Sequence, residues 1–139
     1  MKKVKFVFVV LLILGLFLSK LEAQNYFGNY SGEWSNEEGY VFTFKLHLEK
    51  DNSYFTWTEI NSTYKPKPDT ATAKEFLKIT AGTNNKTLIL VGIRVDDPHN
   101  IIGIDEYSLK LSEDWKVLYG ITKNHGNWKG RIYGIKFIN

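Results

Sequence analysis

Apolar and polar residues alternate strictly over residues 40–48, and this is the clearest pattern in the chain. One face of such an extended segment carries only large apolar side chains: Tyr40, Phe42, Phe44, Leu46 and Leu48. A period of two is typical of a half-buried antiparallel strand. The turn-forming pair Asp51 and Asn52 follows, and residues 53–60 alternate again. We therefore predict two antiparallel strands joined by a tight turn.

The same alternation continues to the end of the chain. It predicts further strands over 30–34, 86–95, 105–111, 116–122 and 128–138. Both faces of 86–95 are apolar, so the pattern leaves open which face points inward. Residues 74–80 are open between a strand and a short helix, because Thr72 and Glu75 have the spacing of a helix capping box.

Seven or eight short strands with no long helical period predict an all-β domain. The expected architecture is a single antiparallel up-and-down β-barrel of about eight strands, or a closed sandwich, because closure removes exposed strand edges. Gly126, Gly130 and Gly134 share one face of the last strand. We expect these glycines to let a curved strand close against its neighbour, the alternative being a glycine-lined ligand surface.

In an up-and-down barrel, alternate connections lie at opposite ends. The connections 49–53, 81–86 and 112–115 share one end and are tight. Those at the other end, the loop-rich end, are mostly longer: 35–39, 61–73, 96–104 and 123–127. Long connections on a rigid sheet are where binding residues gather, and small barrels hold ligands at such openings. The sequence therefore predicts a ligand site at the loop-rich end.

Six side chains are predicted to bind a ligand there: Asn36, Tyr40, Trp57, Glu59, Asp105 and Trp128. Glu59 and Asp105 each share a strand face with aromatic residues. If those faces point inward, both acids lie at the rim of an aromatic cavity, where a carboxylate needs a partner. The alternative is that they are ordinary strand-end acids, in water or paired with Arg94 or Arg131.

The first 23 residues have the layout of a secretory signal peptide: a basic start, an apolar run and a small residue, Ala23, before Gln24. The apolar run, residues 6–18, is shorter than the roughly 20 residues that a membrane-spanning helix needs. We therefore expect a mature domain of residues 24–139 that is secreted or periplasmic in a bacterium and carries no membrane anchor.

Removing residues 1–23 changes the charge of the chain, which is formally +3 as a whole. That segment holds four of the 18 basic and one of the 15 acidic residues, so 14 of each remain and the mature domain is neutral. A neutral domain does not favour nucleic acid as a partner. The chain has no cysteine, so we expect neither disulfides nor a lipoprotein anchor. Nothing in the sequence points to a cofactor or indicates the oligomeric state.

Residues 32–39 read Gly-x-Trp-x-Asn-x-x-Gly, which resembles the opening of avidin-type barrels, and the Gly-x-Trp part is similar to the lipocalin signature. Residues 128–135 are similar to the final avidin strand. Both families are calycin-type antiparallel barrels with ligands at the open end. The avidin resemblance implies that Asn36 contacts ligand and that Trp34 is a packing residue. The middle strands lack the avidin tryptophans and the lipocalin central motif, so the resemblance implies a barrel and its open end, not biotin.

These features favour a non-enzymatic barrel that binds a small apolar or aromatic molecule, or a short peptide. Two alternatives stay open. An exported enzyme or metal-dependent protein would use Glu59 and Asp105 with His99 or His125. A protein-binding inhibitor would use loop 61–73, which two prolines stiffen.

Overall fold

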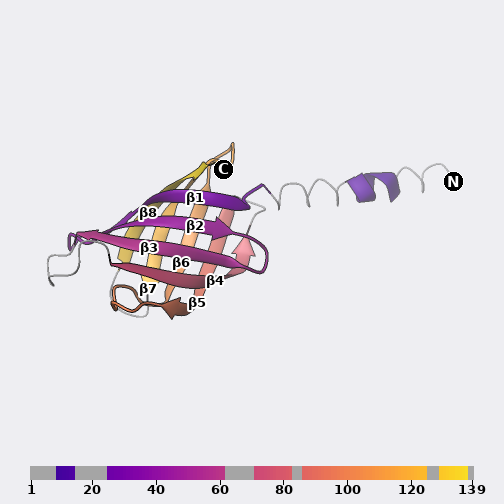
Figure 1. The fold of residues 1–139 in the computed structure, drawn as a ribbon. Coiled ribbons are helices and arrows are strands. Elements are labelled where there is room, and N and C mark those ends of the chain that lie inside the picture. The colour runs from indigo at the N-terminus through magenta and orange to yellow at the C-terminus, as the bar shows by residue number, and fades with distance from the viewer. Residues whose placement is uncertain (1–8, 15–24, 62–70, 83–85, 125–128, 138–139) are drawn as a thin grey trace, which may run out of the picture.

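Eight antiparallel strands pair in chain order, and the last pairs with the first, so the sheet closes into a barrel (Figure 1). The computed structural model describes residues 9–14, 25–61, 71–82, 86–124 and 129–137. The strands are β1 (Gly28–Ser35), β2 (Val41–Leu48), β3 (Ser53–Asn61), β4 (Thr72–Gly82), β5 (Thr87–Asp96), β6 (Asp105–Leu111), β7 (Val117–Asn124) and β8 (Lys129–Phe137). The predicted up-and-down barrel is confirmed.

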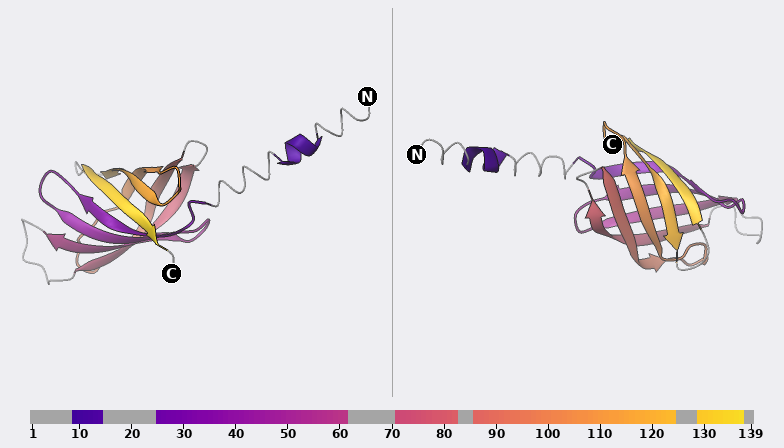
Figure 2. Two further views of the ribbon diagram at one scale, coloured as in Figure 1. Left: turned by 90° about the horizontal axis from the view of Figure 1, so that it is seen from above. Right: turned by 180° about the vertical axis from the view of Figure 1, so that it is seen from behind.

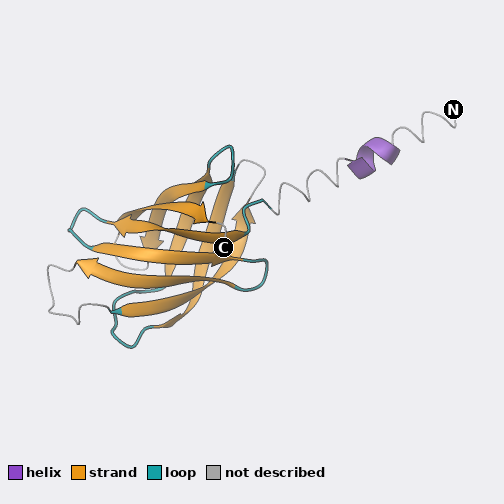
Figure 3. Cartoon of the chain, turned by 45° about the horizontal axis from the view of Figure 1, so that its top comes forward, coloured by secondary structure: helices purple, strands orange, loops and turns teal. Residues whose placement is uncertain are grey.

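The domain consists almost entirely of strands and short connections (Figure 3). Strands β1 to β3 lie on one side of the barrel and cross β6 to β8 on the other side at a steep angle (Figures 1 and 2). Residues 9–14 form a short helix, and the rest of the predicted signal peptide lies outside the described residues. No helix in the described ranges is long and apolar enough to span a membrane.

The barrel closes where β1 meets β8, and a glycine on each strand allows the close approach. Gly32 lies directly opposite Gly134. A Cβ atom added to Gly32 would lie 1.9 Å from the carbonyl oxygen of Tyr133 and 2.6 Å from the Cα atom of Gly134. Because both obstacles are backbone atoms, no side-chain movement could relieve the overlap.

Two of the three glycines predicted to share a face of the last strand, Gly130 and Gly134, lie on the face that is turned toward the barrel interior. A Cβ atom on Gly130 would lie 2.0 Å from the indole of Trp34, and one on Gly134 would lie 2.8 Å from the Phe44 ring. These glycines therefore make room for large side chains from neighbouring strands. Gly126, the third, lies outside the described residues.

The middle of the barrel is filled by a cluster of aromatic rings. The ring centroids of Phe55 and Trp57 are 4.6 Å apart, and Phe44 lies edge-on to both rings at 5.2 and 5.5 Å. Tyr107 approaches Phe55 from β6, with centroids 4.8 Å apart. Burial of each such side chain contributes about 2–3 kcal/mol. The domain is therefore held together by its interior packing, with no disulfide.

The structure resolves the segment that the pattern left open. Residues 72–82 form a strand, and no helix begins at Thr72. The inward face of β5 is the one that carries Leu88 and Leu90, which are fully buried. Ile93 on the opposite face is exposed. The register of β4 and β5 shifts at two positions, between Phe76 and Leu77 and again between Ile79 and Ala81.

His47 lies on the outer face of β2, as its alternation predicts, but it is half-buried rather than fully solvated. Its Nδ1 atom is 2.8 Å from the side-chain oxygen of Asn29, and its Nε2 atom is 3.2 Å from a carboxylate oxygen of Glu49. The ring also lies beside Tyr54, with centroids 5.2 Å apart.

Closure at the β1–β8 seam is testable by adding one methyl group. Gly32→Ala forces a Cβ atom into backbone, so we expect it to lower the free energy of unfolding by about 3 kcal/mol or more. Gly103→Ala is the matched control, because nothing lies within 4 Å of that position. Urea denaturation measures both variants. Equal stability of the two would contradict the seam described here.

Candidate functional site

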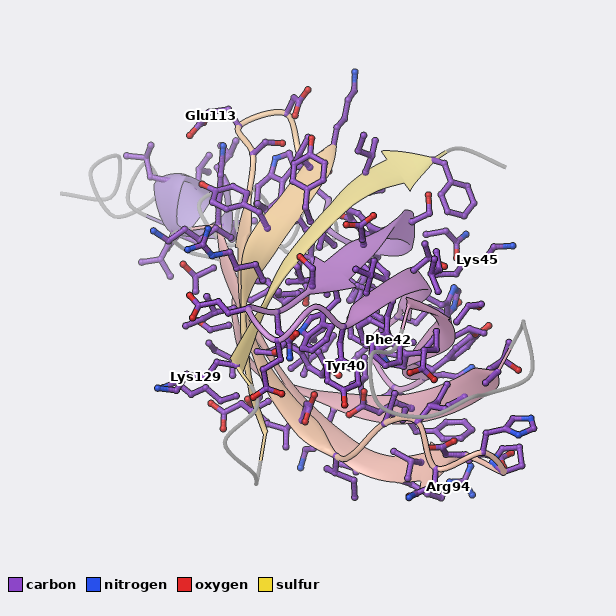
Figure 4. All side chains as sticks on the ribbon, turned by 90° about the vertical axis from the view of Figure 1, so that its left-hand side faces the viewer. Tyr40, Phe42, Lys45, Arg94, Glu113 and Lys129 are labelled. Atoms are coloured by element: carbon purple, nitrogen blue, oxygen red, sulfur yellow. The ribbon has the colours of Figure 1, made fainter. Side chains whose placement is uncertain are left out.

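The two ends of the barrel interior differ in polarity. Toward the tight-turn end, the buried side chains of the described strands carry no charge: they include the leucines Leu46, Leu48, Leu88, Leu109 and Leu118, with the hydroxyl-bearing Tyr30 and Ser53. The buried acids, by contrast, come from the parts of their strands that run toward the loop-rich end: Glu59, Glu75 and, half-buried, Asp105. Figure 4 looks onto this end and shows Tyr40 and Phe42 inside the barrel, whereas Lys45 and Lys129 point away from it.

Glu75 is the best-connected of these acids and has no exposed surface. Its Oε2 atom accepts a hydrogen bond from the Trp57 indole at 3.2 Å and a second, short one from the Tyr107 hydroxyl. Its Oε1 atom accepts a hydrogen bond from the backbone N–H of Asp105 at 3.0 Å. One carboxylate thus ties together β3, β4 and β6.

Gly92 on β5 provides the space that this carboxylate occupies. A Cβ atom at position 92 would lie 2.2 Å from Oε1 of Glu75 and 3.1 Å from the backbone nitrogen of Asp105. Glycine here is therefore explained by the acid that packs over it. Four strands, β3 to β6, contribute to one buried polar cluster.

Burial raises the pKa of Glu75 to about 7, since the charged form loses its hydration. The hydrogen bond from Tyr107 opposes this rise in the pKa, as do the bonds from the Asp105 backbone and from Trp57, while the nearby Asp105 carboxylate adds to it. Burial also raises the pKa of Tyr107 well above its ordinary value, and the neighbouring acids add to that shift. With a pKa of about 7, the Glu75 carboxyl is partly protonated near neutral pH.

Glu59 and Asp105 both lie inside this end of the barrel. Glu59 is only 7% exposed, and its backbone N–H donates to the carbonyl oxygen of Ala71 at 3.0 Å. Asp105 is half-buried, with one carboxylate oxygen enclosed. Arg94, offered above as a partner for them, lies instead over the Phe76 ring at 4.0 Å. Glu59 is therefore not a strand-end acid in open water.

Trp34 closes the β1–β8 side of the same end. Its indole N–H donates to the Thr122 hydroxyl oxygen at 2.8 Å, and that oxygen also accepts from the backbone N–H of Gly130 at 3.2 Å. The indole lies edge-on to Phe42, with centroids 5.5 Å apart. Trp34 is 6% exposed and thus packs in the interior.

Asn36 shapes the β1–β2 loop. Its side-chain oxygen accepts hydrogen bonds from the backbone N–H groups of Glu38 at 3.1 Å and Tyr40 at 3.0 Å. Gly39 has a φ of 88°, which completes the turn and directs Tyr40 into the barrel. Of the six predicted ligand residues, Trp57 and the backbone of Asp105 both donate to Glu75, and the backbone of Tyr40 donates to Asn36 in this loop. Glu59 is buried on β3, and Trp128 lies outside the described residues.

The acidic stretch of the β5–β6 connection also shapes its own loop. One carboxylate oxygen of Asp97 accepts from the backbone N–H of His99 at 3.3 Å, and the other accepts from that of Ile102 at 2.8 Å. Ile101 of this loop is buried against the core. Within the described ranges, no three His, Cys, Asp or Glu side chains are grouped to hold a metal ion, and His125 falls outside those ranges.

A groove of about 610 Å³ opens beside this end, between residues 35–38 and the facing ends of β7 and β8. Three cations and two acids are among the residues that line it: Lys123, Lys129, Arg131, Glu37 and Glu38. The sequence pattern did not reveal it, because its residues come from three separate segments.

The sequence pattern does not single out Glu75 either, because its spacing from Thr72 leaves residues 74–80 open between a strand and a short helix. The signal that could have found it is alternation: Ala73, Glu75, Leu77 and Ile79 share one strand face. An acid in the apolar phase of a strand indicates a buried polar group.

No protein-family model, no curated protein and no solved structure matches this chain. The site must therefore be interpreted from its own geometry.

The raised pKa of Glu75 predicts a pH-dependent stability. The carboxyl group of Glu75 binds its proton more tightly in the folded protein than in the unfolded chain. The contribution of this proton to the free energy of unfolding is therefore complete below pH 4.5 and is lost as the pH rises through about 7. Relative to Glu75→Gln, which cannot titrate, the wild-type free energy of unfolding should fall by about 3 kcal/mol across that range. Urea unfolding at pH 4.5, 6 and 8 measures the difference.

The matched control for this measurement is Glu33→Gln on the exposed outer face of β1. It should leave the pH dependence of the wild type in place. Parallel curves for the wild type and Glu75→Gln would contradict the assignment of the effect to Glu75.

Proposed function

We propose that this protein is a small binding protein that takes a ligand with an apolar or aromatic body and an amine or similar hydrogen-bond-donating group at the loop-rich end of the barrel. The observation that carries the proposal is the uneven interior: three acids, Glu59, Glu75 and Asp105, lie toward one end of a barrel whose described strands bury no charged side chain at the other end. Burying a carboxylate lowers the free energy of unfolding. A binding role would explain why three acids are kept in the interior near one opening despite this cost.

The chemistry of the ligand follows from what these side chains offer. Carboxylates accept hydrogen bonds and attract cations, and aromatic side chains such as Trp57 and Tyr40 are part of the same interior. Glu75 already accepts three hydrogen bonds, so we assign it the role of holding Trp57, Tyr107 and the Asp105 backbone in place. Glu59 and Asp105 are the acids that we assign to direct contact with the ligand.

The ligand would lie at the opening rather than deep in the barrel. The rings of Phe44, Phe55, Trp57 and Tyr107 occupy the middle of the interior, with centroid separations between 4.6 and 6.2 Å. A ligand therefore rests on this aromatic layer and contacts the loops, as small barrels do at their openings. The acid-based enzyme and the inhibitor loop remain alternatives with no observation that favours either.

The protein for these tests is expressed with its own N-terminal segment, and mass spectrometry of the purified protein measures whether that segment has been removed. Loss of residues 1–23 from exported protein would support the export that the N-terminal segment predicts, and an intact Met1 would contradict it.

Thermal shift against a panel of aromatic and aliphatic amines, each paired with its neutral isostere, then measures specificity. We expect at least one amine to bind, and Glu59→Gln or Asp105→Asn to weaken it 10- to 100-fold, on the order of one charge-assisted hydrogen bond. Glu33→Gln is the control and should bind as the wild type does. Equal binding of amines and neutral isosteres, or none of either at millimolar concentration, would contradict the proposal.

A further inference from the structure

The groove beside the loop-rich end is lined by charges of both signs, which come from two different parts of the chain. Lys123, Lys129 and Arg131 line it from β7 and β8. Glu37 and Glu38 line it from the connection between β1 and β2. All five side chains are exposed, so their charges are available to a molecule that enters the groove.

The strand register places the three cations on neighbouring positions of one outer face. Lys123 lies directly opposite Lys129, and Arg131 follows two residues later on the same face of β8. Figure 4 shows that Lys129 points away from the barrel. Directly opposite residues have Cβ atoms roughly 5 Å apart, and residues two apart along a strand are separated by roughly 7 Å. Because lysine and arginine side chains are about as long as these spacings, the three charged groups can converge on one anion.

The protein itself does not neutralise these cations. Glu106 on β6 lies opposite Lys123 in the register. Within the described residues, however, no ion pair joins Lys123, Lys129 or Arg131 to an acid. Like charges that lie directly opposite each other destabilise a sheet. The Lys123–Lys129 pair therefore lowers the free energy of unfolding, and an anion bound between the two side chains would relieve that cost.

The two acids determine what else the ligand carries. Carboxylates beside the cations repel a free anion such as phosphate and attract an ammonium group. A molecule that carries an oxyanion and an amine on one short chain satisfies both sets of charges. The groove volume of about 610 Å³ is within the range of small-molecule sites, roughly 300–1,000 Å³.

We propose that this groove is a second binding site, for a small molecule that carries a phosphate or similar oxyanion and an amine a few bonds apart. The oxyanion lies between Lys123, Lys129 and Arg131, and the amine lies beside Glu37 and Glu38. The site proposed inside the barrel offers carboxylates and no cation to a ligand. The two sites therefore differ in chemistry, and the groove does not depend on the proposed function.

Isothermal titration calorimetry of the full chain, expressed as encoded so that any processing occurs, compares O-phosphoethanolamine with inorganic phosphate and with ethanolamine. At about 20 mM salt we expect phosphoethanolamine to bind with a dissociation constant of about 0.1–1 mM, and each of the other two probes to bind at least about 10-fold more weakly. Raising the salt concentration to about 300 mM should weaken binding, because exposed charges are screened.

Lys129→Gln should weaken binding of phosphoethanolamine about 10-fold, as expected for loss of one exposed charge-assisted hydrogen bond. Its free energy of unfolding should not fall, because the variant removes a like-charge repulsion, which a purely structural role of Lys129 would not predict. Glu37→Gln should reduce the preference for phosphoethanolamine over phosphate to about three-fold or less. Lys78→Gln, on the exposed outer face of β4, is the control and should bind as the wild type does.

The proposal would be overturned by no binding at about 10 mM phosphoethanolamine, by equal binding of phosphate or ethanolamine, or by wild-type affinity in Lys129→Gln. Vesicles that contain phosphatidylethanolamine distinguish two sources of the same chemistry. Pelleting of the protein with them, lost in Lys129→Gln, would support the headgroup of a lipid as the ligand. Binding of free phosphoethanolamine without pelleting would support a soluble molecule.

Discussion

A single buried carboxylate organises the loop-rich half of this barrel. Glu75 on β4 accepts hydrogen bonds from Trp57 on β3 and from both Tyr107 and the backbone of Asp105 on β6. In a low-dielectric interior such bonds are strong, and each donor would be costly to leave unpaired. The aromatic layer, the start of β6 and the glycine of β5 therefore depend on the position of one side chain.

This constraint explains why the two ends of the barrel differ. At the tight-turn end, leucines fill the interior and short turns close it. At the other end, polar side chains take the place of apolar ones, so packing there is maintained by directional bonds. Directional bonds fix the orientation of the Trp57 and Tyr107 rings. The loops at this end also hold their own shape, through Asn36 and Asp97.

Much of the fold could be predicted because alternation along a strand is a local property. Residues 40–48 and 105–111 reveal their inward faces directly. The same logic was less informative where both faces are apolar, as in β5, since only the paired strands decide which face is buried. It missed Glu75, because a capping-box spacing competes locally with alternation and because the three donors to Glu75 come from distant parts of the sequence. Asn36 could be placed in a loop from sequence, but its turn-forming hydrogen bonds could not be foreseen.

The most direct measurement of the central claim is a double-mutant cycle between Gly92 and Glu75. If the carboxylate occupies the space over Gly92, then Gly92→Ala should be costly in the wild type and clearly less costly beside Glu75→Ala, which removes the nearest obstacle at 2.2 Å and leaves those at 2.9 Å (Ile104) and 3.1 Å (the backbone nitrogen of Asp105). We expect a coupling free energy of at least about 2 kcal/mol from urea unfolding of the four proteins. Effects that add to within about 0.5 kcal/mol would contradict the account, because they would mean that the two positions do not share the space.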